Sequence, residues 1–422
     1  MSDPDAARRL LTHILAAALR AVDGRRSVAR ALRDSPLAGP VWICAIGKAA
    51  DAMTRGAVDV LGQQCIGGLL VTKSGHLDPA ATWRDGIETL IGGHPLPTAD
   101  SLYAGTRLLD AIQSAPRTAT LLFLVSGGTS SLVEVPVAGI GLDEVRAVNR
   151  WLLASGLPIQ SLNLVRKSLS QIKAGGLLGR LVDRPVRALA ISDVAGDDPR
   201  VIGSGLLVPE PDLGQRVAEL QLPGWLRGQV AHGLTARGTT TDSGPRIELV
   251  ATLADAKSAA AAAAEPLVRP VRLHDDLVQG DAAESGRRLA RVLMDDAPGL
   301  HIWGGETTVR LPEPPGQGGR NQHLALAAAI EIAGRHDCLL LSAGTDGSDG
   351  PTEDAGALVD GGTLERAELA GLDAEDALRR ADAGSLLEAS GDLLRTGPTG
   401  TNVTDLILGL RLGPVSVARS RP

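Results

Sequence analysis

The stretch from Arg117 to Glu134, RTATLLFLVSGGTSSLVE, has the pattern of a buried strand, a glycine- and hydroxyl-rich turn, and the start of a helix. The apolar run 121–125 is continuous, which favours a parallel strand covered on both faces. The turn after it consists of Ser126, Gly127, Gly128, Thr129, Ser130 and Ser131. Backbone N–H groups can converge in such a turn at a helix N-terminus, where the peptide dipoles favour negative charge. The turn is therefore a candidate phosphate-binding loop, although an ordinary strand-to-helix connection explains the same residues.

The same scheme of a buried strand followed by polar residues recurs along the first half of the chain. It appears in VWICAIGKAADAM (41–53), GGLLVTKSG (67–75), ETLIGGHPLPTADS (88–101) and RALAISDVAGDDPRVIGSG (187–205). Helical patterns lie between these strands. Alternation of strand and helix predicts an α/β fold with a doubly wound, Rossmann-like parallel sheet, whose ligands bind at the carboxyl edge of the strands.

A second set of alternations follows a weakly patterned region. The segment 233–244, GLTARGTTTDSG, has the composition of a linker. The later strand candidates are ELVATLAD (248–255), GLHIWGGETTVRL (299–311), CLLLSAGTDGSDG (338–350) and TDLILGLRL (404–412). We therefore predict two domains, 1–240 and 241–422. The second is a smaller α/β domain with its own sheet, and we expect the active site in the cleft between the two.

Composition and charge indicate a globular protein and argue against one class of partner. The chain has 422 residues, too many for one ordinary core, and its 44% hydrophobic and 22% charged residues are typical of globular proteins. A net charge of −7, without a basic run interleaved with aromatics, argues against a nucleic-acid partner.

Cysteine usage and the N-terminal pattern bear on the compartment. The cysteines Cys44, Cys65 and Cys338 show no CxxC spacing, which favours buried thiols in a reducing compartment over disulfides or a metal site. Charged residues interrupt the apolar N-terminal segment, which fits an amphipathic helix rather than a signal peptide or a membrane span. We expect a cytoplasmic protein.

Common fingerprints of nucleotide and hydrolase sites are missing. Lys48 follows Gly47, but Trp42 stands where a Walker A loop has its first glycine, and Ala49 stands where that loop has Ser or Thr. No GxGxxG follows a strand, which disfavours a nicotinamide dehydrogenase. The motif GxSxG is also missing, so a serine hydrolase has no specific support.

Two basic residues occupy positions suited to anion binding. Lys48 comes at a strand end and a helix start, where its charge can meet a phosphate or carboxylate. A solvated lysine in the first helical turn is the alternative. Arg320, in GQGGRNQHLALA, precedes a strong helical pattern, and an arginine there can bind a carboxylate or phosphate bidentately. A surface arginine in a loop explains that position equally well.

Acidic clusters are the remaining candidates. Aspartates at strand ends can hold Mg²⁺ near phosphates or accept a proton from an attacking hydroxyl, but they also occur in turns because they bind neighbouring N–H groups. The residues in question are Asp193, Asp197, Asp198, Asp346 and Asp349. Glu306, Asn402 and His94 are weaker candidates.

Taken together, these segments resemble the class I glycerate 2-kinases, a family with an N-terminal glycerate kinase domain and a C-terminal domain often labelled MOFRL. Nine motifs occur in the family's order, which makes the resemblance more specific than any one loop. They are AIGKAADAM, GGHPLPTADS, VSGGTSSL, NLVRKSLSQIKAGGL, ISDVAGDD, GGETTVRL, GGRNQ, AGTDGSDGPTEDAG and TGPTGTNVTDL.

The resemblance implies ATP-dependent phosphorylation of D-glycerate to 2-phosphoglycerate with Mg²⁺. It implies that Lys48 and Arg320 are the basic pair of the phosphoryl-transfer site and that Asp193 is the acidic residue at a strand end. It also implies that the loop Ser126, Gly127, Gly128, Thr129 and Ser130 lies near nucleotide or substrate. Asp193 and Asp346 are the candidate metal ligands.

Two alternatives stay open. Some members of the family carry the label hydroxypyruvate reductase, so an NAD(P)H-dependent reductase is one, and a non-catalytic regulator that binds anions or nucleotides is the other. The partners we expect are D-glycerate and ATP, with neither nucleic acid nor membrane, and the sequence is compatible with a homodimer.

Overall fold

A computed structural model describes residues 4–78, 86–237 and 243–413. The chain forms two compact units. The first unit contains Asp23–Ala251 and Gly400–Asn402, and the second contains Met1–Val22, Thr252–Thr399 and Val403–Pro422. The second unit therefore combines the start of the chain with its C-terminal half.

A six-stranded sheet with the order β3-β2-β1-β4-β5-β6 forms the centre of the first unit. Its strands are β1 (Val41–Ile46), β2 (Cys65–Thr72), β3 (Ile87–Ile91), β4 (Thr120–Val125), β5 (Val186–Ile191) and β6 (Ile247–Ala251). All neighbouring strands in it are parallel. This is the strand order of doubly wound dinucleotide-binding folds, so the predicted fold of this unit is confirmed.

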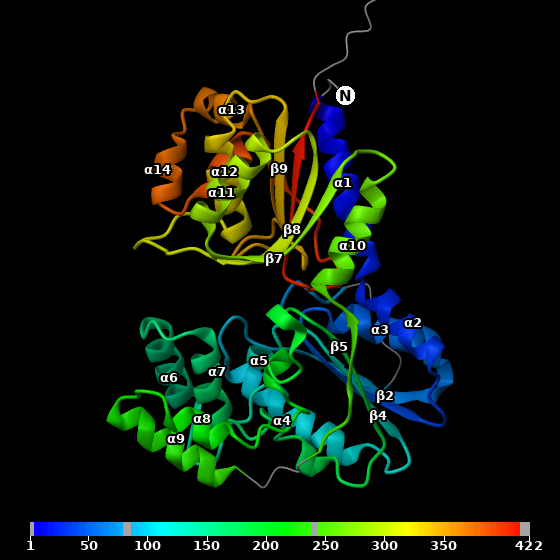
Figure 1. Cartoon of the computed structure of the whole chain (residues 1–422). Helices are drawn as coiled ribbons and strands as arrows, with labels where there is room; N and C mark the ends of the chain where they lie inside the picture. The colour runs from blue at the N-terminus through cyan, green and yellow to red at the C-terminus, as the bar shows by residue number, and fades with distance from the viewer. Residues whose placement is uncertain (1–3, 79–85, 238–242, 414–422) are drawn as a thin grey trace, which may run out of the picture. The chain divides into compact units, whose positions relative to one another are not determined.

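Helices cover both faces of this sheet because its central strands are apolar on both sides. Cys44 and Phe123 lie in one core with residues of α4 (Ala99–Ser114). Helices α2 (Gly24–Asp34) and α3 (Ala50–Leu61) pack against the other face (Figure 1). A strand buried on both faces requires a continuous apolar run, as 121–125 shows.

A group of helices with its own small core extends from this sheet. Its members are α6 (Leu142–Ala154), α7 (Ile159–Ser168), α8 (Leu213–Ala218) and α9 (Gly224–Ala236), which lie together in Figure 1. Trp151 of α6 and Trp225 of α9 meet edge to face, with ring centroids 6.5 Å apart. Short 3₁₀ turns complete the unit: η1 (Gly62–Gln64), η2 (Leu178–Arg180), η3 (Ala195–Asp197) and η4 (Ile202–Ser204).

The second unit contains a mixed six-stranded sheet with the order β11-β10-β9-β12-β8-β7. Its strands are β7 (Val271–Asp281), β8 (Gly299–Thr308), β9 (Cys338–Gly344), β10 (Gly356–Asp360), β11 (Leu393–Leu394) and β12 (Asp405–Arg411). The pair β7 and β8 is parallel, and the other neighbours are antiparallel. The prediction of a second α/β sheet is confirmed.

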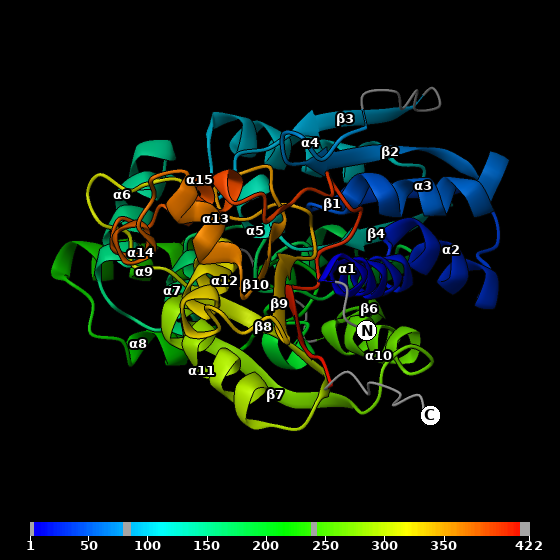
Figure 2. The ribbon, with the colours of Figure 1, turned by 90° about the horizontal axis from the view of Figure 1, so that it is seen from above.

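Helices also flank the second sheet. One core includes residues of α11 (Ala282–Asp295), α12 (Arg320–Glu331), α13 (Thr363–Leu369), α14 (Ala374–Arg379) and α15 (Ala383–Ala389). Helix α1 (Pro4–Ala21) lies beside α10 (Leu253–Ala264), as Figures 1 and 2 show.

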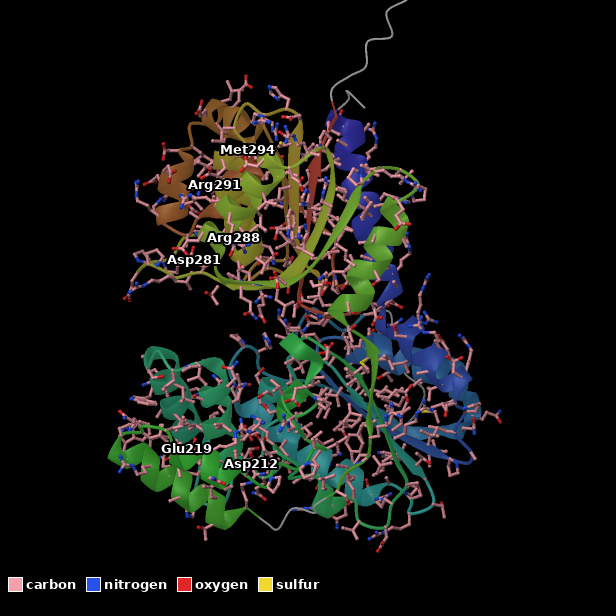
Figure 3. All side chains as sticks on the ribbon, viewed as in Figure 1. Asp212, Glu219, Asp281, Arg288, Arg291 and Met294 are labelled. Atoms are coloured by element: carbon pink, nitrogen blue, oxygen red, sulfur yellow. The ribbon has the colours of Figure 1, made fainter. Side chains whose placement is uncertain are left out.

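Figure 3 shows Arg288, Arg291 and Met294 along α11. The Asp281 carboxylate caps that helix by accepting a 3.0 Å bond from the N–H of Glu284. No helix in the described ranges is long and apolar enough to cross a membrane.

The compact units differ from the predicted division 1–240 and 241–422 in three places. Strand β6 pairs with β5, so the first sheet continues to Ala251, beyond the predicted linker. Helix α1 belongs to the second unit, where Arg8 donates hydrogen bonds to Asp360 (2.5 Å) and to the carbonyl of Leu358 (2.9 Å). The segment Gly400–Asn402 belongs to the first unit, where Asn402 is bonded to Asp193. All three differences involve partners distant in sequence, which local patterns do not specify.

Candidate active site

The loops that follow β1 and β4 meet at the point where the strand order of the first sheet reverses. The backbone N–H of Lys48 donates to the carbonyl of Gly127 at 2.8 Å, and the N–H of Ala49 donates to Ser126 Oγ at 3.0 Å. Ligands of doubly wound sheets bind at this switch point. The structure therefore brings together Lys48 and the glycine-rich loop.

The glycine-rich loop leads into a single helical turn, α5 (Thr129–Leu132). Gly128 has φ +85°, a left-handed conformation that glycine adopts without strain. A Cβ atom at Gly128 would lie 3.2 Å from Lys48 Cγ and 3.3 Å from His94 Cδ2. The side chains of Lys48 and His94 therefore both reach this glycine, so the weaker candidate His94 lies beside the glycine-rich loop.

Two hydroxyl groups of the loop hold its backbone in place. Thr129 Oγ1 donates to the carbonyls of Ile46 (2.9 Å) and Ser126 (2.7 Å), and Ser126 Oγ accepts from Ala49. Both side chains are fully buried. These two hydroxyls therefore shape the loop, whereas Ser130 and Ser131 line a cavity beside it.

Asp193 comes two residues after the end of β5 and lies against the same loop. Its Oδ2 atom accepts a 3.2 Å hydrogen bond from Asn402 Nδ2. A Cβ atom at Gly127 would lie 1.9 Å from Asn402 Nδ2 and 2.0 Å from Asp193 Oδ2, so only glycine allows this approach. The predicted residues Lys48, Gly127 and Asp193 thus lie in one part of the first unit.

A histidine beside Lys48 was not among the sequence candidates. His76, in the loop after β2, places Nδ1 3.2 Å from the carbonyl oxygen of Lys48. His76 follows a strand of the same sheet, as Lys48 does, and this position in the sequence could have identified it as a candidate.

A cavity of about 110 Å³ opens beside the glycine-rich loop. Its walls are Pro95, Pro97, Gly128, Ser130, Ser131, Glu134, Val145, Val148, Asn149, Arg166, Leu169 and Lys173, all from the first unit. Its charged residues were not predicted, although Arg166 and Lys173 lie in the motif NLVRKSLSQIKAGGL that the family resemblance includes.

Arg320 lies at the start of α12 in the second unit, where two carboxylates hold it. Its Nε and Nη2 atoms donate to Asp405 at 2.7 and 2.9 Å, and its Nη1 atom donates to Glu306 at 2.5 Å. Burial lowers the pKa of Arg320, but the charge and hydrogen bonds of Asp405 outweigh burial and hold the pKa above its ordinary value. Arg320 makes its bidentate contact with a carboxylate of the same chain, and its predicted binding of a ligand stays a prediction.

The aspartates after β9 have local partners. Asp349 accepts bonds from the backbone N–H groups of Asn321 (3.1 Å) and Gln322 (2.8 Å) at the start of α12. Burial raises the pKa of Asp349 to about 7, although these two N–H groups lower it. Asp346 Oδ1 accepts from the N–H (2.9 Å) and the hydroxyl (3.0 Å) of Ser348. Both arrangements are typical of capping and turn aspartates.

The predicted residues thus divide between the units. Lys48, the loop Ser126–Ser130 and Asp193 belong to the first, whereas Arg320 and Asp346 belong to the second. Within the described ranges, no group of three or more His, Cys, Asp or Glu side chains is arranged to hold a metal ion.

Comparison with known proteins identifies the family. A model described as a domain of unknown function (DUF4147) matches residues 10–222, and the MOFRL family model matches residues 299–405. The D-glycerate 2-kinase of Thermotoga maritima is 36% identical over 97% of this chain and 100% of its own length. A putative hydroxypyruvate reductase of Agrobacterium vitis is 36% identical over 95% of this chain and 93% of its own.

A solved structure agrees with these relatives. The crystal structure of glycerate kinase from Thermotoga maritima matches with a TM-score of 0.82 and 34% identity, and covers 97% of this chain and 100% of that chain. The chain belongs to the glycerate 2-kinase family.

Proposed function

We propose that the protein transfers the γ-phosphoryl group of ATP to the C2 hydroxyl of D-glycerate, giving 2-phosphoglycerate and ADP. The observation that best supports this function is the contact of Lys48 with the glycine-rich loop at the switch point of the first sheet. Family membership supports the same reaction, because two similar relatives bear the names D-glycerate 2-kinase and glycerate 2-kinase.

Lys48 is the residue to which we assign charge stabilisation. In phosphoryl transfer, catalysis depends on positioning the reactants and on offsetting the charge of the transferring oxygens. The backbone bond from Lys48 to Gly127 fixes where its side chain starts, and its Cγ lies near Gly128. An ammonium group there can interact with the transferring phosphoryl group.

Asp193 is the residue that we propose for Mg²⁺. Mg²⁺ is usually bound through one or two carboxylates together with substrate phosphates, so a site without a cluster of three acidic residues suits it. Asp193 supplies a carboxylate and Asn402, bonded to it, supplies an amide oxygen. When bound there, Mg²⁺ offsets negative charge on the phosphates of ATP. For Asp346, whose carboxylate binds Ser348, a role as metal ligand stays a prediction.

Arg320 is the second basic residue of the proposed reaction. Asp405 and Glu306 engage three of its N–H donors, and a guanidinium has five. The remaining two can meet a phosphate oxygen without breaking the bonds to Asp405. Arg320 can therefore bind a phosphate oxygen while it stays bonded to Asp405.

One assay separates this function from the two alternatives. Purified protein is supplied with ATP, Mg²⁺ and D-glycerate, and separately with NADH or NADPH and hydroxypyruvate, while ADP release and nicotinamide oxidation are followed independently. The proposal predicts ADP and 2-phosphoglycerate in equal amounts and no nicotinamide oxidation. Nicotinamide oxidation without ADP would identify a reductase. Binding of ATP or glycerate without turnover of either would identify a regulator.

The cytoplasmic location and the homodimeric state stay predictions. Cell fractionation tests the first, and light scattering from the purified protein tests the second.

A further inference from the structure

The cavity beside the glycine-rich loop contains three charged side chains: Glu134, Arg166 and Lys173. Lys173 Nζ donates to Glu134 Oε2 at 2.6 Å, and these side chains are 2% and 7% exposed. The second carboxylate oxygen, Oε1, accepts from the N–H of Val135 at 3.0 Å. Lys173 and Glu134 therefore neutralise each other, and the cavity keeps the single positive charge of Arg166.

Only the Nε atom of the Arg166 guanidinium has a hydrogen-bond partner among the described residues. Its Nε atom donates to Asn149 Oδ1 at 2.8 Å, and Asn149 Nδ2 donates to the carbonyl of Val145 at 2.9 Å. Within the described part of the chain, neither Nη atom has a hydrogen-bond partner, and no carboxylate lies within 4.0 Å of this guanidinium. Burial lowers the pKa of Arg166, although the charge of Glu134 raises it.

A guanidinium is ionised under all ordinary conditions, and burying its charge without a counter-ion is costly. Asn149 fixes the direction of the Arg166 side chain without neutralising it. The two Nη atoms of this half-buried guanidinium therefore keep donors available for an anion, and a carboxylate fits a planar guanidinium particularly well.

Size and lining restrict the anion further. A cavity of about 110 Å³ holds several waters, since one water needs about 10–15 Å³ in this measure, whereas pockets for larger ligands reach several hundred Å³. Val145, Val148 and Leu169 give it an apolar wall, and Ser130 and Ser131 bring hydroxyl groups from the loop. These properties suit a small hydroxy acid with one negative charge.

The cavity also adjoins the proposed site of phosphoryl transfer. Gly128 is part of its wall, and a Cβ atom on Gly128 would lie 3.2 Å from Lys48 Cγ. An acid whose carboxylate lies at Arg166 can therefore direct its hydroxyl group to the side where Lys48 is found.

We infer that this cavity is the acceptor site of the enzyme and that Arg166, positioned by Asn149, binds the carboxylate of the hydroxy acid. The inference rests on the proposed kinase function for the identity of the acid. The binding of a small carboxylate at Arg166 is measurable without any turnover.

The test compares Arg166→Gln with Arg150→Gln. Arg150 is exposed on α6 of the same helical group and does not line the cavity, so its variant removes one positive charge elsewhere. Binding of D-glycerate, and of glycerol as a probe without a carboxylate, is measured by calorimetry in the absence of ATP. Loss of charge-assisted bonds predicts at least about 30-fold weaker binding of D-glycerate by Arg166→Gln. Wild-type protein and Arg150→Gln should bind D-glycerate equally, and none should bind glycerol.

Kinetics add a second readout. Arg166→Gln should raise the KM for D-glycerate by a similar factor and leave the KM for ATP within about twofold. If Arg166→Gln does not fold, the variant Arg166→Lys replaces it in the test. Lysine keeps the positive charge but lacks the planar guanidinium, so D-glycerate should bind about tenfold more weakly.

The possible outcomes test the acceptor site and the proposed reaction separately. A folded Arg166 variant that binds D-glycerate as the wild type does, or a wild-type protein that does not bind it, overturns the acceptor site. If the wild-type protein binds D-glycerate through Arg166 but forms no phosphoglycerate, the proposed reaction is wrong and the anion site stands. If it forms phosphoglycerate with a KM unaffected in Arg166→Gln, the reaction stands and the site is wrong.

Discussion

Asp193 and Asn402 are joined by a hydrogen bond of 3.2 Å, although 209 positions separate them in the sequence. Gly127 packs against both side chains so closely that a methyl group in its place would overlap them. The glycine-rich loop, the acidic residue after β5 and a residue near the end of the chain therefore form one local arrangement.

We expect Gly127→Ala to reduce activity far more than stability. The added Cβ would meet the ends of two side chains, which can move aside, so the free energy of unfolding should fall by less than about 1.5 kcal/mol. The displacement of Asp193 and Asn402 should lower kcat/KM for ATP at least about tenfold. Steady-state kinetics and urea unfolding of the same preparation measure the two effects.

Gly228→Ala is the matched control. Gly228 lies in helix α9, and a Cβ there has nothing within 4 Å. The variant should keep wild-type kinetics and gain up to about 1 kcal/mol of stability from helix propensity. Equal kinetics in both glycine variants would remove Asp193 and Asn402 from the reaction.

The carboxylate partners of Arg320 should differ in their contribution to stability. The side chain of Asp405 is 3% exposed and that of Glu306 is 53% exposed. Asp405→Asn leaves a partly buried guanidinium without its main counter-charge and should cost about 1–3 kcal/mol. Glu306→Gln should change the free energy of unfolding by less than about 1 kcal/mol because the pair is open to solvent. Denaturant unfolding of both variants tests this ranking, and a larger loss for Glu306→Gln would contradict it.

Much of the fold is predictable because it is encoded locally. The apolar run 121–125 is buried on both faces, and the strands around it pair in the order of a doubly wound sheet. The sheet to which a strand belongs is not local information, so β6 was assigned to the wrong sheet. The partner of α1 is α10, more than two hundred residues away, and the sequence contains no local signal of that contact.

The same distinction holds for the site. Lys48 and Gly127 each come shortly after a strand, and strands β1 and β4 are neighbours, so their contact follows from the fold class. The pairing of Arg320 with Asp405 depends on a sequence separation of 85 positions, and that of Asp193 with Asn402 on 209. Local sequence patterns do not identify Arg166. It stands out only in the folded chain, where its Nη atoms have no hydrogen-bond partner among the described residues.

Stability should depend on pH through His301. This fully buried ring stacks on His274 and Trp303, and its Nδ1 lies 3.0 Å from His274 Nε2. Burial, followed by the charges of His274 and Arg272, lowers the pKa of His301 from 6.5 to about 4, although Asp296 raises it. The folded state thus binds fewer protons than the unfolded state. Its contribution to stability is complete above pH 6.5 and is lost as the pH falls towards 4.

The variant His301→Gln isolates this effect. Between pH 7.5 and 4.5 the wild-type protein should lose roughly 1–3 kcal/mol more than the variant. Asp349 acts in the opposite direction because burial raises its pKa, so the difference between the two proteins is the quantity to compare. His336, which is exposed, provides the control His336→Gln, whose pH profile should match that of the wild type. Parallel profiles for all three proteins would exclude His301 as the titrating group.

The most direct test of phosphoryl transfer at the switch point is the turnover of Lys48→Ala with saturating ATP, Mg²⁺ and D-glycerate. The removal of one charge that stabilises the transition state predicts a loss in kcat on the order of 10²-fold or more, about 3 kcal/mol, in a protein that unfolds at the wild-type denaturant concentration. A folded Lys48→Ala variant that forms 2-phosphoglycerate at the wild-type rate would contradict the assignment.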